Sequence, residues 1–200
     1  MSRKRIRGSA MVEFVLFAPF LVSLITGTLF YGTRLVKALE VTEIARDTAS
    51  MYARGVDFSD PNNQALVVRL GQDLGLQTSG GNGVVILSTL EYITQTQCDA
   101  FPNKGCNKGN WVYTSVLSFG ATSLRQSNFG APTCTLGSDG SLATADSVTS
   151  SCAIATGFNL LATPSDATDG FKPGQPVYVV EVYAQTGWGP SYGAYTAALF

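Results

Sequence analysis

The sequence predicts an α+β fold, in which a long N-terminal helix packs on a small antiparallel sheet with long disulfide-containing loops. Three observations lead to this prediction: an uncharged run of twenty residues near the N-terminus, three later segments with alternating apolar residues, and four cysteines that all follow the long helix. We divide the chain into a basic leader (residues 1–8), an apolar half-helix (9–33), an amphipathic half-helix (34–55) and an α+β domain (56–200).

Composition excludes several classes of function. The 200 residues carry a formal net charge of −1, and only 14% of them are charged. Histidine is absent, which removes imidazole acid–base chemistry and His-ligated metals. The residues after the leader have an excess of acidic side chains, so no basic face exists to bind nucleic acid. We expect no enzyme activity, no cofactor, no metal and no nucleic-acid partner.

A basic tip precedes the uncharged run. Four basic residues lie among the first seven positions, and Phe14–Thr33 then carries no charge. Twenty helical residues cover about 30 Å, the thickness of a bilayer core. The run is longer than the core of a secretory signal and is followed by no small-x-small cleavage site. The positive-inside rule therefore predicts a single membrane span, with residues 1–8 in the cytoplasm and the chain after Arg34 outside.

The helix is predicted to continue beyond the membrane, from about Ser9 to Arg54. Pro19 predicts a bend, because its missing N–H frees a carbonyl one turn back. Gly55 stands where a left-handed C-cap is wanted. The outer half is imperfectly amphipathic, because Ile44 and Met51 fall on its charged side. Its predicted apolar face consists of Leu35, Ala38, Val41, Ala45, Ala49 and Tyr52.

The residues around the start of the apolar run resemble a class III prepilin signal. The basic leader ends at Gly8, Glu13 follows five residues later, and Phe14 stands beside it. More narrowly, Gly-Ser-Ala-x-Val-Glu-Phe-x-Leu-x-x-Pro, which ends at Pro19, resembles the TadE-like pseudopilins, or minor pilins, of the tight-adherence (Tad/Flp) type IV pilus system. Val15 departs from the Ala that this family often has.

This resemblance implies processing and assembly. An aspartic prepilin peptidase would cut between Gly8 and Ser9, and the family's signature glutamate would map to Glu13, next to Phe14. The apolar helix would pack against those of other pilins on an inner-membrane assembly platform. The chain would thus be a single-pass inner-membrane pseudopilin with an extracytoplasmic domain, used to build a Tad-type pilus or secretion apparatus. The alternative is an uncleaved bitopic membrane protein with an extracytoplasmic ligand-binding domain.

The C-terminal domain is predicted to contain a short helix and three strands. Asp60 and Pro61 form an N-cap and a first helical position, and the helix should run to about Leu74 with Gly75 as its cap. Its expected inward face is Leu66, Leu70 and Leu74. The strands are predicted over Val84–Ile93, Trp111–Phe119 and Val177–Ala184.

The strand patterns predict an antiparallel sheet with one well-covered face and one partly covered face. The exported half of the long helix, Leu35 to Tyr52, is the natural cover. Glu91 and Glu181 are not taken as a catalytic pair, because solvated sheet faces routinely carry single glutamates. The residues expected to share a side are Val84, Ile86, Leu90 and Tyr92 in the first strand, Trp111, Tyr113, Leu117 and Phe119 in the second, and Tyr178, Val180, Val182 and Ala184 in the third.

The remaining region, Gly120–Pro176, predicts a long loop with one short strand near Cys152–Phe158 and a surface for partner contacts. Four cysteines allow three pairings. We favour Cys98–Cys106 and Cys134–Cys152, each of which closes a loop rich in small or polar residues. None forms a Cys-x-x-Cys motif, and an oxidising exterior favours disulfides over free thiols.

Overall fold

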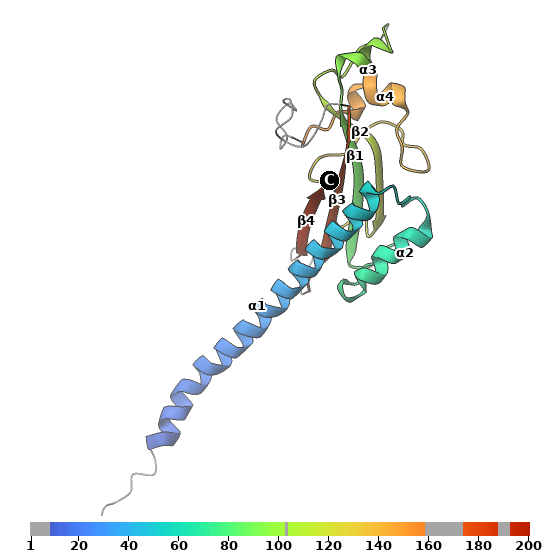
Figure 1. Ribbon diagram of the computed structural model, residues 1–200. Helices are drawn as coiled ribbons and strands as arrows, with labels where there is room; N and C mark the ends of the chain where they lie inside the picture. The colour runs from blue at the N-terminus through green and yellow to red at the C-terminus, as the bar shows by residue number, and fades with distance from the viewer. Residues whose placement is uncertain (1–8, 103, 159–173, 188–192) are drawn as a thin grey trace, which may run out of the picture.

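The computed structural model describes residues 9–102, 104–158, 174–187 and 193–200. Over these ranges it confirms the α+β class, with one long helix and an antiparallel sheet (Figure 1). The elements in chain order are α1 (Ser9–Ala53), α2 (Pro61–Leu70), a 3₁₀ turn (Gln72–Leu74), β1 (Gly83–Tyr92), α3 (Gln95–Asp99), β2 (Trp111–Gly120), α4 (Thr144–Thr149), a second 3₁₀ turn (Ser151–Ala153), β3 (Pro176–Gln185) and β4 (Gly193–Leu199).

α1 is a single helix of 45 residues, as predicted, and it continues through Pro19. The bend expected at that proline stays a prediction. The helix ends at a Schellman motif, in which the Gly55 N–H donates to the Tyr52 carbonyl at 3.0 Å and the Val56 N–H donates to the Met51 carbonyl at 3.1 Å. The φ angle of Gly55 is +84°, a conformation that favours glycine. The predicted cap is therefore confirmed.

The packed face of α1 differs from the predicted face. Leu35 is 63% exposed, whereas Val41, further along the predicted face, is fully buried. Ile44 was placed on the charged side, yet it is buried. The reason is that its side chain lies close to Gly71 at the end of α2, so a second element covers this flank. The buried residues of α1 are Val41, Ile44, Ala45, Thr48 and Ala49.

The sheet has the strand order β2-β1-β3-β4, and all three pairings are antiparallel. The three predicted strands are present within a residue of their expected ends. β4 was not predicted, because its positions toward α1 hold the small residues Ala194 and Ala198 and give no strong alternation. α1 packs on β3 and β4, and its N-terminal half projects away from the domain (Figure 1).

The face predicted for the second strand is wrong, because a β-bulge divides it. The β1–β2 register shifts after Thr89, which leaves Thr114 as an extra residue in β2. A bulge moves every later side chain to the opposite face. Trp111 and Tyr113 consequently lie in one core cluster, and Leu117 and Phe119 lie in the other. The predictions for β1 and β3 are confirmed. The four residues predicted to share a side of β1 lie on the face away from α1, and the four predicted to share a side of β3 lie on the face toward α1.

Both faces of the sheet are covered, in contrast to the expectation of one partly covered face. The segment after β2 folds back onto the face opposite α1, and its buried residues include Phe129, Leu142, Val148 and Phe158. The short strand expected near Cys152–Phe158 is instead a 3₁₀ turn followed by a single bridge between Ile154 and Val112. The rest of the predicted loop, residues 159–173, lies outside the described residues.

α2 begins as predicted, since Asp60 accepts a hydrogen bond from the Asn62 N–H at 2.9 Å. It ends four residues early, at Leu70, and the 3₁₀ turn that follows is closed by Gly75 with φ +71°. The predicted leucine face is wrong in part, because Leu66 and Leu70 are about half exposed whereas Leu74 is buried. The buried residue within α2 is Val67, which joins the cluster under α1.

Candidate functional site

The predicted processing motif lies at the start of α1. Gly8 falls outside the described residues, and Ser9 is the first residue of the helix. Glu13, Phe14 and Pro19 follow on the next turns of the same uninterrupted helix, and the Phe14 side chain is 70% exposed. The motif is therefore presented on one continuous helix, and cleavage after Gly8 stays a prediction.

The first half of α1 exposes its apolar side chains. Every large hydrophobic residue from Met11 to Leu39 is exposed, and none of the most apolar window, with a mean hydropathy of 2.0, is buried. A soluble monomer rarely exposes more than a few hundred Å² of contiguous apolar surface. By length and composition, this helix is able to cross a membrane.

Several hydroxyl side chains of this half form hydrogen bonds with the backbone of the helix itself. Ser23, Thr26 and Thr28 each donate a hydrogen bond to the backbone carbonyl four residues earlier, at 2.8, 2.6 and 2.8 Å. At the outer end, the Arg34 guanidinium lies 4.1 Å from the centre of the Phe30 ring. Such internal hydrogen bonding suits a surrounding that offers no water.

The four cysteines form the two predicted disulfides. Cys98 pairs with Cys106 and Cys134 pairs with Cys152, at Cα–Cα distances of 5.7 and 5.2 Å. This pairing is confirmed. Disulfides of this kind persist in oxidising compartments.

Asn107 connects the two cross-linked loops. It follows Cys106 directly and is 5% exposed. Its backbone N–H donates to the Val148 carbonyl at 2.8 Å, and its side-chain amide donates to the carbonyls of Ser147 and Ser150 at 2.9 and 2.7 Å. α3 and α4 are thereby held side by side at the end of the domain far from the first residues of α1 (Figure 1).

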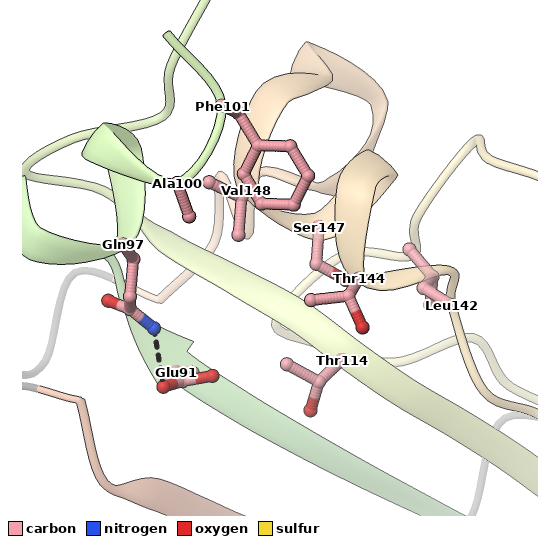
Figure 2. A pocket seen from close by; sticks show the side chains of 9 residues that line it. All are labelled: Glu91, Gln97, Ala100, Phe101, Thr114, Leu142, Thr144, Ser147 and Val148. Atoms are coloured by element: carbon pink, nitrogen blue, oxygen red, sulfur yellow. Dashed lines mark hydrogen bonds between the residues drawn. The ribbon is translucent and has the colours of Figure 1, made fainter.

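A pocket of about 260 Å³ lies between α3, α4 and the sheet. At its base the Gln97 side-chain amide donates to Oε1 of Glu91 at 2.6 Å, as the dashed line in Figure 2 marks. Burial raises the pKa of the Glu91 carboxyl, and the hydrogen bond from Gln97 opposes this shift. The lining residues are Glu91, Gln97, Ala100, Phe101, Thr114, Leu142, Thr144, Ser147 and Val148.

Glu181 is a structural anchor and forms no pair with Glu91. It lies opposite Ile86, five positions from Glu91 along β1, which separates the two by about 17 Å at the usual strand rise. The Glu181 side chain is 2% exposed. It accepts hydrogen bonds from the Asn128 N–H at 2.8 Å, from the Tyr195 hydroxyl at 2.7 Å, and from the Ser127 hydroxyl.

These bonds tie the segment after β2 and the edge strand β4 to the centre of the sheet. Arg125 adds a cation above the Tyr195 ring, at 4.1 Å from its centre. The sequence did not reveal this cluster, because Ser127 and Asn128 lie more than fifty positions before Glu181 and no local motif links them to it. Within the described residues, no group of three or more Cys, Asp or Glu side chains is arranged to hold a metal ion.

Comparison of the chain with protein-family models, with curated proteins and with solved structures finds no match. The functional argument therefore rests on the residues and geometry described above: an exposed apolar helix with a motif at its start, and a cross-linked domain with a pocket at its far end.

Proposed function

We propose that this chain is a minor pilin or pseudopilin, processed by a prepilin peptidase between Gly8 and Ser9 and used to assemble a Tad-type pilus or secretion apparatus. The observation that carries this proposal is the division of α1. Its first half exposes all its large apolar side chains, and its second half packs on the sheet without any break in the helix. The Gly8-to-Pro19 motif stands at the start of that helix.

A helix of this design suits a subunit that leaves the membrane for a filament. The exposed apolar surface needs a cover in each state, and lipid supplies it before assembly, whereas the helices of other pilins supply it afterwards. Because the helix is continuous into the domain, its position in a helical bundle would also set the position of the domain. The partners are then the peptidase, the other pilins and an inner-membrane platform.

Glu13 has a defined role in this proposal. Cleavage creates an α-amine on Ser9, with a reference pKa near 8, and the amine lies at a helix start where the dipole disfavours positive charge. Packing of helices removes solvent from both groups, and a charge shielded from water is stable only when it is paired. The Glu13 carboxylate of one subunit beside the Ser9 amine of its neighbour would satisfy both and set the stagger between helices.

The first test is the intact mass of the full chain, purified from a host with and without an active prepilin peptidase. We expect the peptidase to remove residues 1–8 from the wild type. Gly8→Val should block cleavage by crowding the scissile backbone. Gly27→Val is the matched control on the same helix, where an added side chain meets no atom within 4 Å, and it should be cut normally. A wild type that keeps residues 1–8 overturns the proposal.

The second test separates assembly from processing. Glu13→Gln should be inserted and cut like the wild type, because neither step needs the charge. Its co-purification with partner pilins should fall several-fold, because the Ser9 amine then lacks its counter-charge. Equal recovery of the complex by this processed variant would show that the carboxylate has no part in assembly.

One observation favours a second candidate function. The pocket beneath α3 and α4 fits the alternative of an uncleaved bitopic protein with an extracytoplasmic ligand-binding domain. The mature mass distinguishes the two, because only the pilin requires removal of residues 1–8.

A further inference from the structure

We infer that the pocket between α3, α4 and the sheet binds an alkylammonium group, with Glu91 as its counter-ion. This inference needs neither cleavage after Gly8 nor assembly through α1, so it holds for a pilin and for a bitopic binding protein alike. It rests on the charge of the pocket, its apolar walls, its size and its fixed geometry.

Glu91 places one negative charge in the pocket, and the described residues of the chain place no cation beside it. None of the nine lining residues is Lys or Arg, and no positively charged side chain of the described residues is among the causes that shift the pKa of Glu91. A half-buried carboxylate without a counter-charge is unfavourable. A cationic ligand relieves this cost, whereas an anion would add to it.

The carboxylate is also held in a fixed orientation. Gln97 accepts hydrogen bonds at its amide oxygen from the N–H and hydroxyl of Thr94, at 2.8 and 3.1 Å, in a capping box at the start of α3. Its NH₂ group therefore points toward Oε1 of Glu91. In Figure 2, Gln97 lies on one side of Glu91, and Thr114 and Thr144 lie on the other.

The remaining walls match a charged head on a hydrocarbon chain. An ammonium group has three N–H donors, and the Glu91 carboxylate with the hydroxyls of Thr114 and Thr144 provides acceptors. Phe101, Leu142 and Val148 supply apolar surface for methylene groups, and the Phe101 ring is the type of surface that attracts a cation.

The size of the pocket limits the ligand. A volume of about 260 Å³ is below the roughly 300–1,000 Å³ of sites for drug-sized molecules. One lysine-like chain fits this space better than a larger ligand. Both helical walls are cross-linked, since Cys98 lies in α3 and Cys152 lies in the turn directly after α4. Asn107 joins the two walls, so the pocket is formed before any ligand arrives.

The test uses the full chain in detergent micelles, with ¹³C-labelled methyl groups in Leu, Val and Thr. n-Pentylamine at pH 7 should shift the methyl signals of Leu142, Thr144 and Val148 in a saturable way. The neutral isostere n-pentanol should bind at least tenfold more weakly, because it leaves the carboxylate without a counter-charge. Shifts that do not saturate, or equal binding of amine and alcohol, would overturn the inference.

Variants of the pocket sharpen this test. Glu91→Gln should weaken amine binding at least tenfold, whereas Glu43→Gln, which removes an exposed carboxylate on α1, should leave it unchanged. Ala100→Leu keeps the charge and fills the space, so it should also weaken binding, and it provides a second measurement if Glu91→Gln fails to fold. Binding that survives in both pocket variants would contradict the proposed site.

Two further probes identify the source of the amine. Nα-acetyl-lysine methylamide carries the chain on a peptide backbone, and pentane-1,5-diamine is a free diamine. Binding of the capped lysine at least as tight as that of pentylamine points to a lysine side chain of a partner protein. Binding of the diamine alone points to a free amine, and binding of neither overturns the inference.

Discussion

The two faces of the sheet are covered by very different pieces of chain. One face is covered mainly by α1, whose buried positions from Val41 to Ala49 form one stripe of a regular helix, with Val67 of α2 in the same cluster. The other is covered by the segment from Gly120 to Phe158, whose only regular pieces among its described residues are α4 and a 3₁₀ turn.

A regular helix and an irregular segment need different interactions to stay packed on a sheet. A helix satisfies its own backbone groups, so α1 is held mainly by apolar packing, to which the Tyr52 hydroxyl adds polar contacts near the helix end. An irregular segment has fewer internal bonds and more conformational entropy to lose. It is held by the Cys134–Cys152 disulfide, by hydrogen bonds to Glu181, and by the hydroxyl of Tyr113.

The strongest test of this comparison truncates one leucine on each face. Leu87 and Leu90 both lie in β1 with no exposed surface, Leu87 in the cluster under α1 and Leu90 in the cluster under the loop segment. Leucine-to-alanine changes in cores cost about 2–5 kcal/mol, and least where the surroundings collapse into the space. We expect Leu87→Ala to cost more than Leu90→Ala in the free energy of unfolding, measured by denaturant titration of the full chain. The reverse order would show that the irregular segment does not collapse into the space left by a truncated leucine more readily than α1 does.

Removing the disulfide of the loop cover should have the next largest effect. In the chain-entropy model, Cys134→Ala with Cys152→Ala lowers the free energy of unfolding by about 3 kcal/mol, since the bridge spans a sequence separation of 18. Cys98→Ala with Cys106→Ala is the matched control, with a separation of 8 and an expected loss of about 2.5 kcal/mol. An unchanged stability on removal of the longer bridge would mean that other contacts hold the segment.

Alkaline pH should loosen the loop-covered face. Burial, with a smaller effect from Glu181, raises the pKa of Tyr113 from 10.0 to about 12, and its hydroxyl donates to the carbonyls of Phe129 and Gly130 at 2.8 and 2.9 Å. A raised pKa contributes stability that is complete below pH 10 and is lost as the pH rises through about 12. The loss is at most about 2.7 kcal/mol for two pKa units.

The measurement is the free energy of unfolding between pH 9 and 12 for the wild type and for Tyr113→Phe. The variant should show a flatter pH dependence. Burial and Glu181 also raise the pKa of Tyr195, so part of the dependence should persist. Identical slopes for the two proteins would exclude Tyr113 as the titrating group.

The smallest effect is expected at the polar contact between the end of α1 and the sheet. The Tyr52 hydroxyl lies 2.8 Å from the Thr89 hydroxyl and 2.9 Å from the Ser115 hydroxyl. Those two hydroxyls also bond each other at 3.1 Å, so neither loses every partner in Tyr52→Phe. We expect a loss of about 1 kcal/mol or less in thermal or denaturant unfolding. A loss above 2 kcal/mol would show that α1 depends on polar ties as the loop cover does.

The sequence predicted those parts of the fold that repeat a local rule. α1 and its cap at Gly55, the three longer strands, and the disulfide pairing all follow from periodicity, from a residue with special backbone freedom, or from loop closure. β4 was not predicted because its residues that pack toward α1, Ala194 and Ala198, are small and produce no alternation of large apolar and polar side chains. The bulge at Thr114 was not predicted, because a single extra residue in a strand can be recognised only from its pairing with the partner strand.

The candidate sites differ in the same way. The motif from Gly8 to Pro19 is contiguous, so it was found in the sequence. The pocket brings together Glu91, Gln97 and Thr144 from β1, α3 and α4, and a pattern search cannot join residues from three separate elements. Glu91 was noticed only as one half of a catalytic pair, and its position opposite the end of β3, far from Glu181, removes that interpretation.

The pairing of β4 with β3 under α1 has a consequence for biogenesis. α1 is made before every other described element, whereas β4 is made after all of them, and the two pack together (Figure 1). Contacts so distant in the chain form late, since the intervening polypeptide must first be confined. If α1 is inserted into a membrane during synthesis, the half that packs on the sheet stays partly uncovered until β4, the last of the described strands, has been made.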